Sequence, residues 1–228
     1  MQPNFQTYQP TSISELRHKV LRNTYALLGL SLIPTILGAL IGTNLSFAFL
    51  KTSTIIGMLG VLAVIYALIS AIEKNRYSPA GIYLMLAFTF TMGLLLGPIL
   101  QLALSIKNGA NLIIMAGGAT AAVFLVMSAI GATTKRDLSG LGNFLSVGVV
   151  VLIVAIVANL CLQIPVLHLT IAAAIALLSS LMIMCQVKVI IDGGETNYIW
   201  AALSIYLSIC NLFTSLLHLL IAFSGNRD

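Results

Sequence analysis

The chain has 228 residues, of which 59% are hydrophobic and only 7% charged, and its mean hydropathy is +1.06. These values lie far outside those of soluble globular domains and predict an integral membrane protein. The net charge of +5 and the pI of about 9.3 do not indicate nucleic-acid binding, because the 11 basic residues are scattered between apolar runs rather than clustered on one face with aromatics. We expect the positive charge to face the headgroups of the lipid bilayer.

The chain opens on a polar segment with two prolines and no apolar run of signal-peptide length. We therefore predict that residues 1–23 form an uncleaved, flexible cytoplasmic tail. Residues 24–223 form one transmembrane domain, since neither an internal repeat nor a loop long enough for a second domain is present. Residues 224–228 form a short external tail.

Seven apolar runs have the length needed to cross a hydrocarbon core of about 30 Å, which takes about 20 helical residues. A soluble helical bundle would need a polar face every third or fourth residue, and stretches such as VGVVVLIVAIVANLCL have none. We predict an all-α membrane protein, a seven-transmembrane-helix bundle. Its spans are predicted at 24–44, 53–72, 80–104, 112–132, 144–163, 167–191 and 198–223.

The basic residues between the spans predict the orientation, because cytoplasmic loops carry an excess of Lys and Arg. One side of the membrane has three of the 11: Lys51, Lys107 and Arg227. The other side has eight: Arg17, Lys19, Arg22, Lys74, Arg76, Lys135, Arg136 and Lys188. The amino terminus is therefore predicted to be cytoplasmic and the carboxyl terminus external.

The third span is interrupted by the sequence TMGLLLGPIL. Pro98 removes a backbone donor and crowds the preceding turn, so a kink is predicted at Gly97 and Pro98. Such breaks either line a cavity or serve as packing kinks, and both interpretations remain open.

No predicted span carries a carboxylate near its middle, although intramembrane acids are the usual mark of proton relays and cation paths. The seventh span instead carries a polar stripe at helical spacing, which we expect to face other helices rather than lipid. It consists of Ser204, Ser208, Asn211, Ser215 and His218. Hydrogen-bonded packing and a hydrated ion path are the two interpretations.

The sixth span places Ser179 and Gln186 on one face, with Gln186 about 8 Å from the cytoplasmic end at 1.5 Å per residue. Ser208 lies about 15 Å deep on the antiparallel seventh span, so the two side chains could meet directly or through a water. Lys188 either extends its amino group to the interface or pairs with Glu73 at the end of span two.

The sequence DGGETN joins spans six and seven on the cytoplasmic side. Asp192, Gly193 and Gly194 are predicted to end span six, and residues from Glu195 onward to cap the start of span seven. A binding partner could also read these acids, so a purely structural turn and a recognition site both remain open.

No enzymatic constellation is present. His18, His168 and His218 fall in the tail, the fifth loop and span seven, without a paired carboxylate and without an HExxH, Walker or GxSxG pattern. The cysteines lack metal-ligand spacing and are predicted to be small buried hydrophobes, namely Cys161, Cys185 and Cys210. We predict no enzyme activity, no cofactor and no metal site.

Several stretches together resemble a known family. They are HKVLRNTYALLGL before span one, GPIL at 97–100, TTKRDLSGLG at 133–142, VANLCLQIPVLHLTIAAA at 157–174 and GGETNYIWAALSIYLSICNLFTSLL at 193–217. They are similar to the YccA-type inner-membrane proteins of bacteria, a branch of the BAX inhibitor-1 family. The similarity runs from about residue 18 to the end, in register across all seven spans. It implies a bundle in which six helices surround a central seventh, in the inner membrane, with a periplasmic carboxyl terminus.

For the YccA-type branch, the resemblance implies a modulator of the membrane-anchored AAA protease FtsH. Such a protein is a slow substrate and competitor that engages the protease through its amino-terminal tail, and regulators of FtsH are further candidate partners. The candidate partner-binding residues in this chain are Glu15, Arg17, Lys19 and Arg22.

For the wider family, the resemblance implies a pH-regulated calcium leak carried by two aspartates on spans six and seven. In this chain the matching stretches QVKVII and LSIYLS place Gln186 and Ser208 at those positions. Neither side chain titrates, and two neutral oxygens replace carboxylates poorly as calcium ligands. The alternative function is a cation leak through this altered, non-acidic site, with Asn211 and Lys188 beside it.

Overall fold

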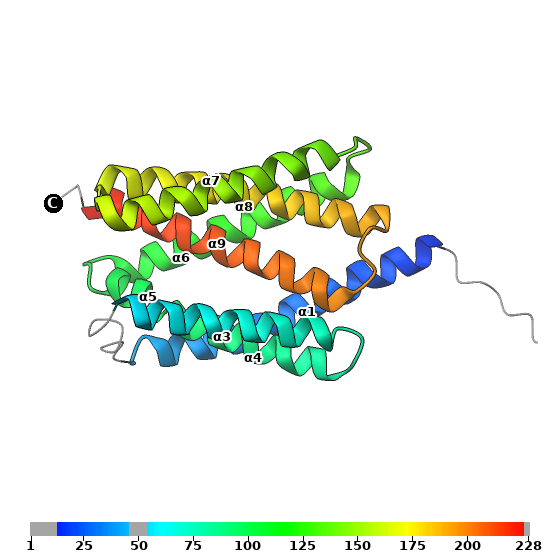
Figure 1. The fold of residues 1–228 in the computed structure, drawn as a ribbon, viewed down its shortest axis with the longest axis horizontal. Helices are drawn as coiled ribbons and strands as arrows, with labels where there is room; N and C mark the ends of the chain where they lie inside the picture. Colours follow the sequence, from blue (N-terminus) through cyan, green and yellow to red (C-terminus); the bar gives the residue numbers. More distant parts are fainter. Residues whose placement is uncertain (1–12, 46–53, 226–228) are drawn as a thin grey trace, which may run out of the picture.

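The computed structural model describes residues 13–45 and 54–225, and in these ranges the secondary structure is entirely α-helical (Figure 1). The helices are α1 (Ile13–Gly42), α3 (Thr54–Lys74), α4 (Ala80–Leu95), α5 (Gly97–Leu104), α6 (Gly109–Thr133), α7 (Ser139–Leu162), α8 (Pro165–Asp192) and α9 (Tyr198–Gly225).

Six stretches of these helices are long and apolar enough to cross a membrane. They are Arg17–Gly42, Ala80–Leu104, Gly109–Thr133, Ser139–Leu162, Pro165–Asp192 and Tyr198–Ser224. Five of them match a predicted span to within about five residues at each end, and the first starts earlier than predicted. The remaining predicted span, 53–72, falls on α3, a helix of 21 residues that lies along α4.

The first helix begins earlier than predicted. Residues 13–23, which the composition assigned to a flexible tail, form about the first three turns of α1. Their sequence ISELRHKVLRN contains strong helix formers and neither Gly nor Pro, and Glu15 in the first turn favours a helix amino terminus. Residues 1–12 of the predicted tail, and most of the predicted tail at 224–228, lie outside the described residues.

The core of the bundle lies around α9, which contacts α1, α3, α4, α5, α6 and α8. Its Tyr206 side chain is fully buried, and the ring meets Phe88 of α4 edge-on, with the ring centroids 6.2 Å apart. The Tyr206 hydroxyl shares a hydrogen bond of 2.7 Å with Oγ1 of Thr35 on α1 and donates to the Thr89 carbonyl at 3.3 Å. One side chain thus links α9 to both α1 and α4.

Helices α1 and α4 approach until their backbones touch, because glycines line the contact on both sides. A Cβ atom on Gly38 would overlap the carbonyl oxygen of Phe90, and one on Gly93 would overlap the carbonyl oxygen of Thr35. Further along, Gly42 and Gly97 pack on each other in the same way. Small residues of this kind let membrane helices gain van der Waals contact that lipid cannot supply.

At one end of the bundle, a side-chain amide covers the carboxyl terminus of α1. Gln101 Nε2 donates to the carbonyl oxygens of Gly42, Thr43 and Leu45 at 3.2, 2.9 and 3.0 Å. The last carbonyls of a helix have no partner within the helix, and an unpaired carbonyl in hydrocarbon raises the free energy of the fold. The Gln101 amide avoids this cost by bonding them.

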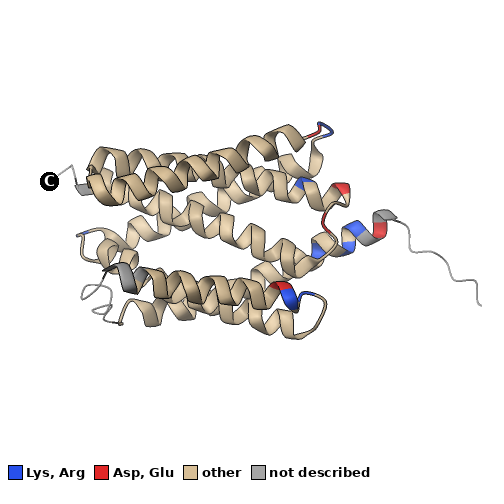
Figure 2. Cartoon of the chain, in the orientation of Figure 1, with Lys and Arg blue, Asp and Glu red and all other residues tan. Residues whose placement is uncertain are grey.

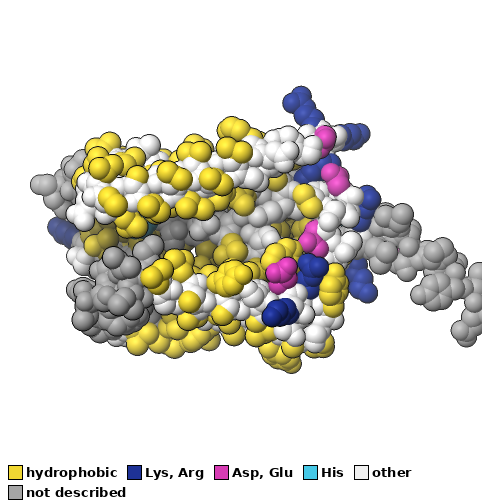
Figure 3. Space-filling model, in the orientation of Figure 1, with side chains coloured by type: hydrophobic (Ala, Val, Ile, Leu, Met, Phe, Trp, Pro, Cys, Tyr) yellow, Lys and Arg dark blue, Asp and Glu magenta, His cyan; other side chains and the backbone are white. Residues whose placement is uncertain are grey.

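Charged residues gather at the other end, which we name the basic end (Figure 2). It comprises the start of α1 and the connections α3–α4, α6–α7 and α8–α9, and the space-filling view shows apolar side chains along the flank beside it (Figure 3). Among the described residues, Lys107 is the basic residue at the opposite end, while Lys51 and Arg227 lie outside them. The predicted charge asymmetry is therefore a property of the folded molecule.

We expect the substitution Gly38→Ala to lower the thermal unfolding temperature in detergent micelles, because its methyl group would force α1 and α4 apart. Overpacking of this kind costs about 1–3 kcal/mol. Gly29→Ala on the same helix is the control, because no atom lies within 4 Å of a Cβ placed there. Alanine should be neutral or slightly stabilising at position 29, since it is the better helix former. Equal unfolding temperatures for the two variants would contradict the proposed contact.

Candidate functional site

The structure brings Gln186 of α8 and Ser208 of α9 into direct contact. Gln186 Nε2 donates to Ser208 Oγ at 3.1 Å. The Ser208 hydroxyl faces two acceptors, Gln186 Oε1 at 3.2 Å and the Ser204 carbonyl at 3.1 Å. The two side chains thus satisfy each other without a carboxylate, and nothing in this pair changes its charge with pH.

The polar stripe of α9 faces other helices only in part. Ser208 and Ser215 are buried, whereas Asn211 is exposed, so the expectation that the whole stripe faces protein is wrong at Asn211. Helix rotation contributes to this exposure, because Asn211 lies on the side of the stripe turned away from the buried positions Ile205 and Leu212. No described residue of α7 contacts α9 to cover that edge.

The predicted helix break lies at Leu96, between the end of α4 at Leu95 and the start of α5 at Gly97. Pro98 stands in the first turn of α5, where its missing N–H leaves no helical bond unmade. Gly97 itself packs against Gly42 of α1.

The acidic turn between α8 and α9 has a structural role for each polar group. Gly193 ends α8 in the left-handed region with φ +84°, and the N–H groups of Gly193 and Gly194 donate to the carbonyls of Ile190 and Val189. A left-handed glycine is the usual way to end a helix.

Lys188 Nζ pairs with Asp192 at 2.7 Å. The pairing with Glu73 considered from sequence is wrong, because Asp192 is one helical turn away and no described residue of α3 contacts α8.

The start of α9 is capped by Asn197. Its Oδ1 accepts hydrogen bonds from the N–H groups of Ile199 and Trp200 at 3.1 and 3.0 Å, and its Nδ2 donates to the Arg76 carbonyl at 2.6 Å. Glu195 Oε1 accepts from the Asn197 N–H at 2.7 Å. The turn therefore caps one helix and joins it to the α3–α4 connection.

The candidate partner-binding residues all lie on the first turns of α1 and are exposed: Glu15, Arg17, Lys19 and Arg22. Arg17 also lies against the end of α8, because a Cβ on Gly193 would come within 2.9 Å of Arg17 Nε. A guanidinium is favoured there, since the carboxyl end of a helix carries partial negative charge.

Two histidines that the sequence left apart meet at the end opposite the basic end. His168 lies in the first turns of α8 rather than in a loop, and its ring meets that of His218 with centroids 5.1 Å apart. Within the described residues no group of three or more His, Cys, Asp and Glu is placed to hold a metal ion.

The predicted burial of the cysteines is confirmed for Cys210 but is wrong for Cys161, which is exposed on α7. The reason is that α7 contacts α8 alone among the described helices.

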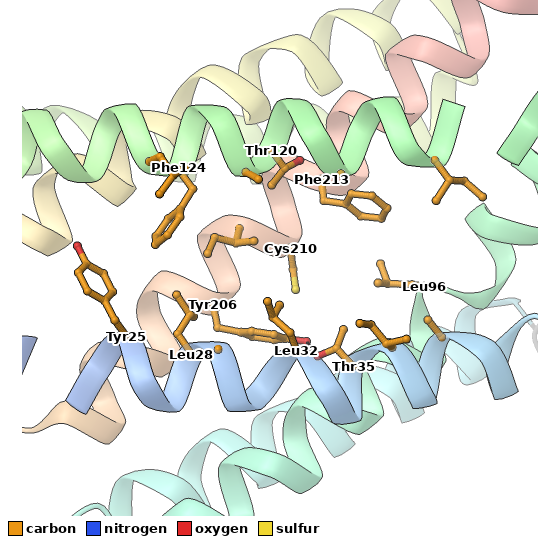
Figure 4. Close-up of a pocket in the computed structure, with 18 of the residues that line it drawn as sticks. Tyr25, Leu28, Leu32, Thr35, Leu96, Thr120, Phe124, Tyr206, Cys210 and Phe213 are labelled. Carbon is orange, nitrogen blue, oxygen red and sulfur yellow. Dashed lines mark hydrogen bonds between the residues drawn. The ribbon is translucent and has the colours of Figure 1, made fainter. Parts of the chain in front are cut away.

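A large cavity opens between α1 and α6, with α9 as its floor, and we name it the α1–α6 groove (Figure 4). It encloses about 1070 Å³. The lining is almost wholly apolar, with Leu28 and Leu32 from α1, Phe124 from α6 and Phe213 from α9. Leu96, at the helix break, also lines it. The sequence did not predict this groove, because its pattern does not distinguish leucines that line a cavity from leucines that face lipid.

These apolar helices define a multi-pass α-helical membrane protein. The family described as Inhibitor of apoptosis-promoting Bax1 matches residues 17–225. The chain belongs to this family, which covers the bundle from the first turns of α1 to the end of α9.

Bacterial relatives match over nearly the whole chain. An uncharacterized protein of Neisseria meningitidis serogroup A is 50% identical over 220 residues, covering 96% of this chain and 97% of the relative. A protein of Escherichia coli K12 named Modulator of FtsH protease YccA is 44% identical over 204 residues, covering 89% of this chain and 90% of the relative. A further relative in Escherichia coli O6:H1, with the same identity and coverage, is named Inner membrane protein YccA.

We expect Ser208→Ala to destabilise the bundle by about 1 kcal/mol, because it leaves the partly buried Gln186 amide without its partner. Ser204→Ala is the matched control, since Ser204 donates only to the Trp200 carbonyl of its own helix. Unfolding in detergent micelles measures both.

A double-mutant cycle isolates the bond itself. It compares the single variants Ser208→Ala and Gln186→Leu with the double variant that carries both substitutions. If the direct bond carries the effect, the double variant loses less stability than the two single losses added together. Strict additivity would contradict the bond.

Proposed function

We propose that this protein is an inner-membrane modulator of a membrane-anchored AAA protease of the FtsH type, which it occupies as a slow substrate and competitor. The observation that carries the proposal is the 44% identity, over 89% of the chain, with the Escherichia coli protein named as a modulator of that protease. The pair Gln186–Ser208 and the histidine pair support no other function as strongly as this identity supports the modulator role.

We infer that the chain crosses the membrane seven times, with α3 as the second crossing and α9 central. The 21 residues of α3 span about 32 Å at 1.5 Å per residue, enough for a hydrocarbon core of about 30 Å. The basic end then faces the cytoplasm, which places the amino terminus inside and the carboxyl terminus in the periplasm.

This arrangement would present residues 1–12 to a cytoplasmic protease ahead of α1. A pull on that segment would load α1 first, and α1 is held by its glycine contacts with α4 and by Thr35, which bonds Tyr206. Removing α1 would therefore disturb the contacts of α9 as well. The packed bundle thus supports the proposed slow processing, because extraction of α1 would break its contacts with both α4 and α9.

The competition is expected to depend on residues 2–12. Their deletion leaves α1 complete, so the unfolding temperature should not change, while the protein should lose its ability to slow the degradation of a second membrane substrate by FtsH in proteoliposomes. The control replaces residues 2–12 with a Gly/Ser segment of equal length, which separates sequence recognition from reach. Undiminished competition by the deleted form would refute a role for this segment.

A cation leak is the second candidate function, because the resemblance to the wider family places an ion path at Gln186 and Ser208, which are in contact here. The pair is neutral, and its polar atoms bond each other. Calcium prefers six to eight oxygen ligands, normally with carboxylates among them.

We accordingly expect calcium-dye-loaded liposomes with the reconstituted protein to show no more calcium entry than protein-free liposomes at pH 6 or pH 8. A flux that Ser208→Leu abolishes, and that Ser204→Leu leaves intact, would instead establish the leak and its path.

A further inference from the structure

We propose that the α1–α6 groove is a binding site for one anionic phospholipid, whose acyl chains fill the groove and whose phosphate lies at the basic end. This site is independent of the protease role. The proposal rests on the shape of the groove, on its unpartnered lining and on the charge at its mouth.

The groove runs the length of the hydrocarbon region. On α1 its lining extends from Leu21 to Thr43, a rise of about 33 Å. An apolar cavity of this size does not hold water, and left empty its lining would lose its dispersion contacts. In a bilayer the adjoining apolar material is the acyl chains.

An aromatic bridge across the groove favours a flexible chain over a transmembrane helix. The volume of the groove is about 1070 Å³. The rings of Tyr25 and Phe124 meet across the groove, with centroids 6.0 Å apart (Figure 4). A continuous helix would have to displace this bridge, while an acyl chain bends past it.

Residues in the groove wall lack partners inside the protein. Gly29 of α1 and Gly117 of α6 have no atom within 4 Å of a Cβ placed on them, unlike the glycines of the α1–α4 contact. Ser128 is 7% exposed, and its Oγ is a buried side-chain atom without a hydrogen-bond partner in the part of the chain described. It lies about 8 Å inside the end of α6, on the side of the basic end.

The mouth of the groove at the basic end is cationic. His18 and Arg22 stand seven residues before Tyr25 and Gly29, so they continue the stripe of α1 that faces the groove. Lys135 and Arg136 follow the end of α6. Such basic pairs attract anionic headgroups.

The acid of the same connection, Asp137, is directed to the start of α7. Its carboxylate accepts hydrogen bonds of 2.9 Å from the N–H and the hydroxyl of Ser139, which hold its pKa below the usual value. It therefore leaves Lys135 and Arg136 available to a phosphate.

The test uses the full chain reconstituted in bilayers of equal parts phosphatidylglycerol and phosphatidylethanolamine, then extracted in mild detergent for native mass spectrometry. The wild type should retain one phospholipid, enriched in phosphatidylglycerol. Gly117→Leu and Gly29→Leu, from opposite walls, should lose it. Gly118→Leu is the matched control, because Gly118 adjoins Gly117, also has no atom within 4 Å of an added Cβ and does not line the groove.

The headgroup is tested separately. Arg22→Gln should keep the phospholipid but lower the enrichment in phosphatidylglycerol about fivefold, while Lys107→Gln at the opposite end should not. Retention by both groove variants at wild-type level, equal loss in Gly118→Leu, an enrichment unchanged by Arg22→Gln, or a second polypeptide in place of the lipid would each overturn the proposal.

Discussion

The structure depends on one constraint, that hydrocarbon offers no hydrogen bond to a polar group. The hydroxyls inside the helices meet it locally, as when Thr24, Ser31 and Thr120 donate to carbonyls four residues earlier. Others meet it between helices, and these bonds fix the bundle. Tyr206 joins three helices through its ring and hydroxyl, and Gln186 joins α8 to α9 through Ser208. Asn197 and Gln101 do the same for helix ends.

Two polar residues lie where the described part of the bundle is open. Asn211 is exposed on the edge of α9 that α7 does not reach, and Ser128 Oγ, in the wall of the α1–α6 groove, lacks a hydrogen-bond partner among the described residues. A buried polar group without a partner is costly in a membrane, so Ser128 is expected to serve something other than stability. The groove is the better defined of the two, since its walls, its floor and its charged mouth all come from described helices.

The bonded pair Gln186 and Ser208 limits the chemistry available between α8 and α9. A carboxylate pair near the membrane interior can share or release a proton, whereas an amide and a hydroxyl hold a fixed charge of zero and bond each other. The interior then contributes rigidity. Outside this apolar interior, exposed charges at the start of α1 stand beside the α8–α9 turn.

The sequence by itself determined that the chain is an all-helical membrane protein, the approximate position of most helices and the charge asymmetry of the ends. The length of an apolar run and the placement of Lys and Arg are local or additive properties, so both can be predicted without knowing the tertiary contacts. It also placed Gln186 and Ser208 within reach of each other, because depth along a helix follows from residue count.

Only the tertiary structure decided which partner each polar group takes and which apolar surfaces face one another. Lys188 bonds Asp192 rather than Glu73, and Asn211 is exposed, because helix rotation and neighbour choice depend on all the packing contacts at once. The same holds for glycines: Gly38 and Gly29 lie on one helix, yet one touches the backbone of α4 and the other faces the groove. In a chain this apolar, core and lipid-facing positions have the same composition, and only the three-dimensional contacts distinguish them.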